Sequence, residues 1–198
     1  RMLRIHVGDI PSTGPEFDAT GGVKIQEFLG LKNERLLGVF DISGENELLL
    51  GTRDGVVKRV AADYPAKDEF ELIALKGDDE LVGITVANGV QECVFVTNDA
   101  QLLRFDANVL RAQGRAASGV AGINLAAGAR AIYFGTVTSS DDVHVVTAAN
   151  SSDALAGTDA GSVKWTPLSE FPAKGRATGG VRAHKFIRTE DQLYFGWA

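Results

Sequence analysis

Cationic side chains recur in the middle of short apolar segments, and a row of such cations could bind the phosphate groups of a polyanion. Four segments share this pattern: Leu3-Arg4-Ile5, Val57-Lys58-Arg59, Leu103-Arg104-Phe105 and Val163-Lys164-Trp165. Their central cations follow one another at steps of 54, 46 and 60 residues. A cation that returns at one place of a repeat favours a binding role, although single cations on half-exposed strands are also common simply because they are solvated.

Two connectors downstream of these segments carry further cations beside glycine. They read Gln113-Gly114-Arg115 before Gly119-Val120, and Lys174-Gly175-Arg176 before Gly180-Val181. Glycine lets a backbone approach a ligand closely, but it also closes turns, so the pattern has a phosphate-binding and a purely structural interpretation. The residues expected to contact phosphate are Lys58, Arg59, Arg104, Arg115, Lys164, Lys174, Arg176, Arg182 and Lys185.

The charge of the chain is unevenly distributed. Its 26 acidic and 20 basic residues give a net charge of −6. Residues 41–80 hold 11 acids and 5 bases, whereas residues 159–188 hold six bases and two acids. Because the whole chain is acidic, phosphate binding is expected only on a positive surface formed by the second half.

Other kinds of site find little support in the residue pattern. His6, His144 and His184 lie far apart without metal-ligand spacing, so no metal site is expected. The single cysteine, Cys93, excludes an internal disulfide, and its apolar neighbours predict a buried, inert thiol. No Gly-x-x-x-x-Gly-Lys loop occurs, so no cofactor is expected in this chain. No apolar run reaches the length of a membrane helix, and no secretory signal is visible.

Short apolar runs bounded by turn residues predict an all-β fold with under about 10% helix. Asp54-Gly55 and Asn98-Asp99 each separate two strand-like runs, as a hairpin requires. The expected strands are Leu36–Ile42, Glu47–Thr52, Val56–Val60, Leu81–Val86, Glu92–Thr97, Leu102–Phe105, Ala131–Val137, Val143–Thr147, Val163–Thr166 and Leu193–Trp197. The polar stretch Ala148–Thr158 is expected to be an exposed loop.

Two further series of residues repeat in step with the cations. Gly38, Gly83, Gly135 and Gly196 each follow an apolar residue, and Gly-Val pairs occur at 22–23, 119–120 and 180–181. The three series keep one order along the chain, which defines a unit of about four strands per ~50 residues, the size of a propeller blade. Four such units fit, and residues 1–198 are expected to form one domain. The ring would either close on the N-terminal strand or belong to a longer array.

The third and fourth units resemble a known blade signature. Val163-Lys164-Trp165-Thr166-Pro167-Leu168-Ser169-Glu170-Phe171, followed by the Gly-Arg and Gly-Val elements, is similar to the repeat of the C-terminal domain of bacterial type IIA topoisomerase A subunits. That family includes the A subunits of gyrase and of topoisomerase IV. The resemblance implies an all-β β-pinwheel, a propeller-like ring of about four four-stranded antiparallel blades that exchange strands.

The resemblance also implies a function. Such a domain binds and bends double-stranded DNA on its outer rim and presents DNA segments for strand passage. The partners it implies are the rest of the A subunit, which forms a homodimer, and the ATPase B subunit, in a bacterial cytoplasmic enzyme that uses ATP and Mg²⁺. The nucleophile of that enzyme is a tyrosine beside an arginine. Tyr64, Tyr133 and Tyr194 follow Asp, Ile and Leu, so catalysis is expected outside this chain.

The chain departs from the gyrase pattern at one motif. Gyrase carries a basic, glutamine- and glycine-rich box in its first blade, whereas residues 14–22 contain two acids and no cation. The segment 113–119 is the nearest equivalent and has one cation, Arg115. Strong DNA wrapping is therefore not expected, and the topoisomerase IV A subunit is the closer resemblance. Two alternatives are a protein-interaction scaffold that binds no DNA, and an enzyme with a site in the channel of the ring.

Overall fold

The fold consists of small antiparallel sheets and almost no helix. The structure is a computed structural model, which describes residues 1–11, 22–42, 44, 46–89, 92–138, 142–155 and 161–198. Its strands are β1 (Met2–Leu3), β2 (Leu48–Thr52), β3 (Val56–Val60), β4 (Glu69–Phe70), β5 (Leu81–Val86), β6 (Glu92–Thr97), β7 (Gln101–Asp106), β8 (Ala112–Gln113), β9 (Val120–Ala121), β10 (Ala131–Val137), β11 (His144–Asn150), β12 (Ser162–Pro167), β13 (Val181–Arg182) and β14 (Gln192–Trp197). One α-helical turn, α1 (Ile25–Phe28), and the 3-10 turns Val7–Asp9, Ala107–Val109 and Leu168–Glu170 complete the described elements, so the all-β prediction is confirmed.

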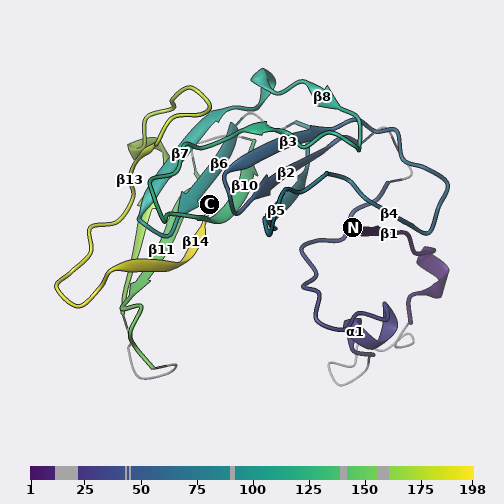
Figure 1. Cartoon of the computed structure of the whole chain (residues 1–198), viewed down its shortest axis with the longest axis horizontal. Coiled ribbons are helices and arrows are strands. Elements are labelled where there is room, and N and C mark those ends of the chain that lie inside the picture. Colours follow the sequence, from purple (N-terminus) through teal and green to yellow (C-terminus); the bar gives the residue numbers. More distant parts are fainter. Residues whose placement is uncertain (12–21, 43, 45, 90–91, 139–141, 156–160) are drawn as a thin grey trace.

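The sheets share one plan in which strands are exchanged between units. The second sheet has the order β5-β2-β3, with β8 and β9 along the outer edge of β3, and the third has the order β10-β6-β7-β13. The last sheet has the order β12-β11-β14, and the first consists of β1 and β4. In each of the first three sheets the outermost strand comes from the following unit of the chain. The sheets follow one another along an arc, with β8 and β13 toward its outer side (Figure 1).

The hairpins form because their turn residues can adopt the required backbone. Gly55, between β2 and β3, has φ +81°, and Ala100, between β6 and β7, has φ +63°. In both turns the preceding threonine hydroxyl accepts a backbone N–H four residues later, from Val56 to Thr52 and from Gln101 to Thr97. The two hairpins predicted from Asp54-Gly55 and Asn98-Asp99 are therefore confirmed.

Apolar layers between successive sheets form the core. Leu48, Leu50 and Val60 pack toward the first sheet, in a cluster that includes Phe70 and Leu72. The opposite face of the second sheet, Leu49 and Val57, packs against Cys93, Phe95 and Phe105 of the third sheet. The far face of the third sheet, Val94, Val96 and Leu102, packs against Val145, Ala149 and Leu193 of the last sheet. The strands β2 and β6 thus bury alternate residues against two different neighbouring sheets.

One recurring glycine permits a close approach of two inner strands. A Cβ at Gly83 on β5 would lie 2.0 Å from the carbonyl oxygen of Phe134 on β10. The backbone of β10 cannot move aside cheaply, so only glycine fits at this contact. Gly196 is similarly close to another sheet, because its Cβ would lie 2.8 Å from a methyl carbon of Val96.

Three sequence-based expectations need correction. Leu36–Ile42 forms no strand, and the described parts of the first and last sheets have two and three strands instead of four. Of the two alternatives left open for the ring, closure through the N-terminal strand is not seen among the described residues, where β1 pairs with β4. Ala148–Asn150 belong to β11 instead of a loop, whereas residues 156–160 lie outside the described part of the chain. None of the described helices is long and apolar enough to cross a membrane.

Candidate phosphate-binding surface

The recurring strand cations occupy two different positions, one residue apart. Arg59 lies opposite Leu49, and Arg104 lies opposite Val94, so these two arginines are equivalent. Lys58 lies opposite Leu50 and points to the other face of the sheet. The sequence alignment of Lys58 with Arg104 is therefore wrong by one residue, and a one-residue shift in a strand reverses the side-chain direction.

The arginine position is occupied by internal ion pairs. Arg59 Nε lies 2.5 Å from Glu47 Oε2, and Arg104 Nη1 lies 3.1 Å from Glu92 Oε2. Glu92 lies on the adjacent hairpin strand β6, and Glu47 lies one residue before β2; all four side chains are less than a third exposed. Arg59 and Arg104 are thus already neutralised within their sheets, which weakens both as phosphate ligands compared with free surface cations.

Lys58 is buried and cannot reach a phosphate from this position. Its side chain is 1% exposed. The ammonium donates to the carbonyl oxygens of Leu72 at 2.7 Å and of Arg115 and Ala117 at 2.8 Å. Burial, together with the charge of Arg115, lowers the pKa of Lys58. The expectation that Lys58 binds phosphate is therefore wrong: the side chain joins its own unit to the Gly-Arg connector of the next one.

Lys164 occupies in the last sheet the position that Lys58 has in the second sheet, but its environment is different. It lies opposite Thr147, and its ammonium donates to the carbonyl oxygen of Ala183 at 3.1 Å. Ala183 and Leu72 hold equivalent places, just after the strand that each unit exchanges. Lys164 itself is exposed, so it remains available to an outside ligand.

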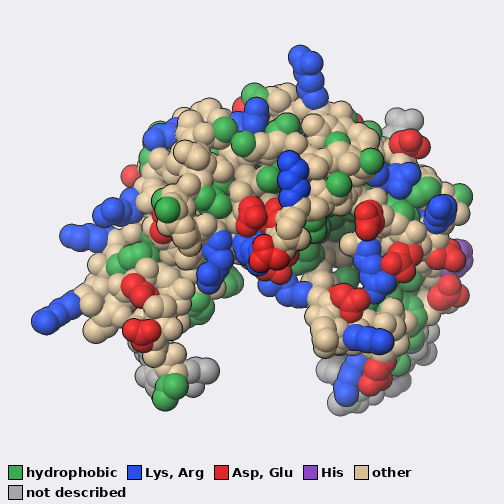
Figure 2. All heavy atoms as spheres, viewed as in Figure 1, with side chains coloured by type: hydrophobic (Ala, Val, Ile, Leu, Met, Phe, Trp, Pro, Cys, Tyr) green, Lys and Arg blue, Asp and Glu red, His purple; other side chains and the backbone are tan. Residues whose placement is uncertain are grey.

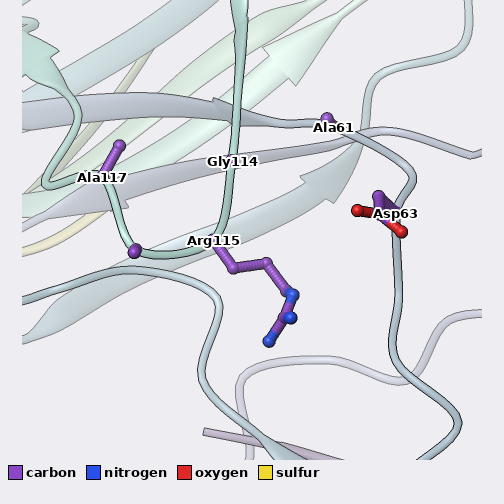
Figure 3. A pocket seen from close by; sticks show the side chains of 6 residues that line it. Ala61, Asp63, Gly114, Arg115 and Ala117 are labelled. Atoms are coloured by element: carbon purple, nitrogen blue, oxygen red, sulfur yellow. The ribbon is translucent and has the colours of Figure 1, made fainter.

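The Gly-Arg connectors lie along the outer edges of the second and third sheets. β9 pairs with β3, and β13 pairs with β7. Arg115 projects from its connector beside a shallow cavity of about 400 Å³, with Asp63 on the facing segment (Figure 3). Its guanidinium carbon also lies 5.8 Å from the centre of the Phe70 ring, a stacking contact that orients the side chain.

The second connector carries more accessible cations. Lys174 donates to the carbonyl oxygen of Gly180 at 3.0 Å and is exposed. Arg176 donates to the carbonyl oxygen of Ala121 in the first connector. Arg182, on β13, and Lys185 are exposed. Six of the nine predicted residues are therefore exposed or partly exposed, on the two connectors or on β12: Arg115, Lys164, Lys174, Arg176, Arg182 and Lys185.

The two connectors are joined into one continuous edge. The backbone N–H of Ala177 donates to Gly122 O at 2.7 Å, and that of Asn124 donates to Thr178 O at 3.0 Å. The Arg176 side chain crosses the same junction to Ala121. The connectors therefore form one surface, here called the connector edge and defined as residues 111–124 and 174–188.

Three exposed cations of this half of the chain were not among the predicted phosphate ligands: Arg111, Arg130 and Arg188. A usable signal was the absence of acids, since residues 107–138 and 171–189 contain no Asp or Glu. Lys and Arg side chains project from the upper and left rim in Figure 2, whereas many acids gather toward the N-terminal half. In that half, one arginine, Arg53, lies within ion-pair distance of three acids: Asp54, Asp78 and Glu80.

The glycines of the two connectors are not required by packing. A Cβ at Gly114 or Gly175 would meet no atom within 4 Å, and neither residue has a positive φ. By contrast, Gly119 and Gly180 have φ +83° and +74° and would clash with the backbone of β3 and β7. The backbone therefore requires glycine at Gly119 and Gly180 of the Gly-Val pairs. It does not require glycine at Gly114 and Gly175 of the Gly-Arg pairs, so the purely structural interpretation does not account for those two.

Other titratable groups are structural. The hydroxyls of Tyr64 and Tyr133 donate to the carbonyl oxygens of Asn46 and Ala198, and burial raises the pKa of both tyrosines. Cys93 is fully buried, as predicted, and burial raises the pKa of its thiol to about 12. Among the described residues, no three His, Cys, Asp or Glu side chains gather as metal ligands would.

Comparison with known proteins identifies the family. The family model "DNA gyrase C-terminal domain, beta-propeller" matches residues 46–63, 91–137 and 152–186, which together make up half of the chain. The chain belongs to the DNA gyrase C-terminal domain family. The DNA gyrase A subunit of Deinococcus deserti is 30% identical over 191 residues, and that of Haemophilus influenzae is 30% identical over 181.

These relatives are much longer than this chain. The matches cover 91% and 76% of this chain but only 22% and 20% of the two gyrase proteins, respectively. Among solved structures, the C-terminal domain of a DNA topoisomerase IV superposes with a TM-score of 0.68 and 26% identity, covering 80% of this chain and 48% of that one. The E. coli ParC C-terminal domain superposes with a TM-score of 0.55 over 76% of this chain and 61% of its own, at 15% identity, and supports the β-pinwheel fold alone.

Proposed function

We propose that residues 1–198 form a non-catalytic accessory domain of a type II DNA topoisomerase A subunit, which binds and bends duplex DNA along the connector edge. The observation that carries the proposal is the continuity of this edge: two acid-free cationic connectors from adjacent sheets are joined by hydrogen bonds at their ends. Membership of the gyrase C-terminal domain family supports the same conclusion.

The chemistry of the connector edge suits a duplex backbone better than a small anion. The cations Arg111, Arg115, Lys174, Arg182 and Lys185 come from two connectors, which lie along the outer edges of two different sheets. Spread cations neutralise successive phosphates and release counterions, which makes affinity strongly salt-dependent. Gly114 and Gly175 leave the backbone of each connector uncovered beside a cation, which allows a phosphate strand to approach closely.

The rest of the enzyme would supply the catalytic chemistry. The hydroxyls of Tyr64 and Tyr133 are engaged with backbone carbonyls, and no tyrosine of this chain follows an arginine. In the bacterial cytoplasm, this domain would then work with components that act outside it. These are the remainder of the A subunit and its homodimeric copy, the ATPase B subunit, ATP and Mg²⁺. Gln113–Gly119 contributes only one cation, so bending without strong wrapping is proposed. Residues 14–21 of the other box-like connector lie outside the described part of the chain.

Charge reversal tests the proposal. The variant Arg111→Glu, Arg182→Glu, Lys185→Glu changes exposed side chains that form no hydrogen bond or ion pair with another described residue. We expect duplex binding at least tenfold weaker, about 1.4 kcal/mol, with the melting temperature nearly unchanged. The slope of log K against log salt should be about −5 for the parent chain and should flatten by about 0.9 for each phosphate contact that is lost.

A matched control separates a local site from a general charge effect. The variant Arg35→Glu, Lys67→Glu, Lys76→Glu makes the same change of net charge at exposed positions among the acids of the N-terminal half. It should weaken binding much less than the connector-edge variant. Equal losses from the two variants would refute the connector edge, and no salt-dependent binding by the parent chain would favour a protein-interaction scaffold instead.

A further inference from the structure

The arginine of the second Gly-Arg pair, Arg176, points toward the first connector. Its guanidinium Nη1 donates to the carbonyl oxygen of Ala121, which lies on β9. Arg176 is partly buried, in contrast to Lys174 and Arg182 of the same connector, which are exposed. A hydrogen bond from a charged donor is stronger than one between two neutral groups. Arg176 therefore makes a side-chain link between the two connectors, whereas its cationic neighbours remain open to an outside ligand.

The arginine of the first Gly-Arg pair makes a comparable contact with the unit before it. Arg115 lies five residues before Val120, as Arg176 lies five residues before Val181. The guanidinium carbon of Arg115 lies 5.8 Å from the centre of the Phe70 ring, and Phe70 belongs to β4. β4 and β9 are the short strands that the preceding units exchange. In both units, the arginine that follows the glycine therefore contacts the exchanged strand of the preceding unit.

Backbone hydrogen bonds beside each arginine repeat in the same way. The N–H of Ala74 donates to the carbonyl oxygen of Ala117 at 3.3 Å, and the N–H of Asn124 donates to that of Thr178 at 3.0 Å. Each acceptor lies two residues after the arginine of its Gly-Arg pair. The junction between successive connectors is therefore a repeated feature of the fold, and the arginine supplies its side-chain contact.

The two connectors that Arg176 joins are held by different sheets. β9 of the first connector pairs with β3 of the second sheet. β13 of the second connector pairs with β7 of the third sheet, and the N–H of Lys174 donates to the carbonyl oxygen of Arg104 on β7 at 3.0 Å. The bond from Arg176 to Ala121 thus links the outer edges of two sheets, and with them the cations that each connector presents.

We propose that Arg176 is a positioning residue, which fixes the distance between the two connectors and thereby the angle to which a bound duplex is bent. The bending part of this inference rests on the proposed function of the connector edge. Duplex DNA resists bending, so a bent path persists only while the cations of neighbouring connectors keep a fixed separation. A connector that moved away from its neighbour would let the duplex relax toward a straight path. Arg176 acts through the connectors and makes no phosphate contact of its own.

The spacing of the connectors can be measured without DNA. Ala116 of the first connector and Ala173, just before the second, are exposed, so nitroxide labels on Ala116→Cys and Ala173→Cys report this spacing in pulsed dipolar EPR. Cys93 is fully buried and takes no label. In Arg176→Met the distance distribution should become about twice as broad as in the parent chain. The matched control Arg182→Met, which changes an exposed cation of the same edge, should leave the distribution unchanged. An unchanged width in Arg176→Met would overturn the proposal.

DNA binding separates a positioning role from a phosphate contact. Arg176→Met should reduce the bend of a bound duplex by about a third, measured by energy transfer between dyes at the two ends of the duplex. The slope of log K against log salt should remain that of the parent chain, whereas Arg182→Met should flatten it by about 0.9. A slope flattened by about 0.9 in Arg176→Met would assign Arg176 to a phosphate and overturn the proposal. An unchanged bend angle in Arg176→Met would overturn it as well.

A conservative variant shows whether the hydrogen bond is the cause. Arg176→Lys keeps a charged donor for the carbonyl oxygen of Ala121, so it should restore the narrow distance distribution and the bend angle of the parent chain. A distribution as broad as that of Arg176→Met would contradict the proposal. If the parent chain bent no duplex, the proposed function would fail, and the label distances alone would decide whether Arg176 fixes the spacing of the connectors.

Discussion

Replacing Lys58 with methionine tests whether this cation stabilises the fold or binds DNA. Lys58→Met keeps the length of the side chain but removes the ammonium that donates to Leu72, Arg115 and Ala117. Hydrogen bonds from a charged group contribute about 1.5–3 kcal/mol each, so three are worth about 4.5–9 kcal/mol. The substitution also removes the cost of burying the ammonium, which is several kcal/mol. The expected net loss is about 2–4 kcal/mol.

The assay is thermal unfolding followed by DNA titration of the folded variant. For a chain of this size the loss corresponds to a fall in melting temperature of about 4–16 °C. Lys164→Met is the matched control, because Lys164 holds the equivalent position with one recorded carbonyl acceptor and is exposed; we expect a loss below about 1 kcal/mol. The salt slope of DNA binding should be the same for Lys58→Met as for the parent. A slope flatter by about 0.9 with an unchanged melting temperature would refute the structural role.

Three further predictions concern stability and reactivity. Gly83→Ala should cost about 3 kcal/mol in unfolding experiments, because its Cβ would lie 2.0 Å from a carbonyl oxygen of β10, whereas Gly114→Ala, with open space around it, should cost less than about 0.5 kcal/mol. Ala177→Gly should raise the free energy of unfolding by about 1 kcal/mol, because glycine adopts the positive φ of 63° without strain. Ala100→Gly should leave the free energy of unfolding nearly unchanged, because Ala100 has the same φ but the substitution also removes a buried methyl group. The buried Cys93 thiol should resist alkylation until the protein unfolds, and since burial raises its pKa from 9.0 to about 12, stability should fall as the pH rises from 9 toward 12; rapid alkylation of the native protein would contradict this.

Most strands were predictable because their signals are local. Runs such as Val56–Val60 and Ala131–Val137 coincide with β3 and β10, since β-branched residues between turn signals specify extended backbone. Leu36–Ile42 is similarly apolar but forms no strand. A strand requires a hydrogen-bonding partner as well as an extended sequence, and the described residues do not pair with this segment.

The choice of binding residues depended on information that is not local. Lys58 and Arg59 are adjacent in sequence, yet one is saturated by carbonyls of the next unit and the other pairs with Glu47 of its own sheet. Nothing in the sequence reveals that Arg115 and Ala117 will present carbonyl oxygens to Lys58, because those residues lie more than fifty positions away. The scarcity of acids in this half of the chain was visible in the sequence and predicted a positive surface there, but Arg111 and Arg188 were not included among the expected phosphate ligands.

By itself the sequence determined the all-β class, the repeat of about fifty residues, the two hairpins and the polarity of the charge distribution. These follow from turn residues, alternation and composition, which act over a few residues each. Only the tertiary structure decided that the connectors of different units join into one edge and that Lys58 is a buried link between units. The physical reason is strand exchange: each unit completes its neighbour, so the role of a side chain is set by residues from the next unit.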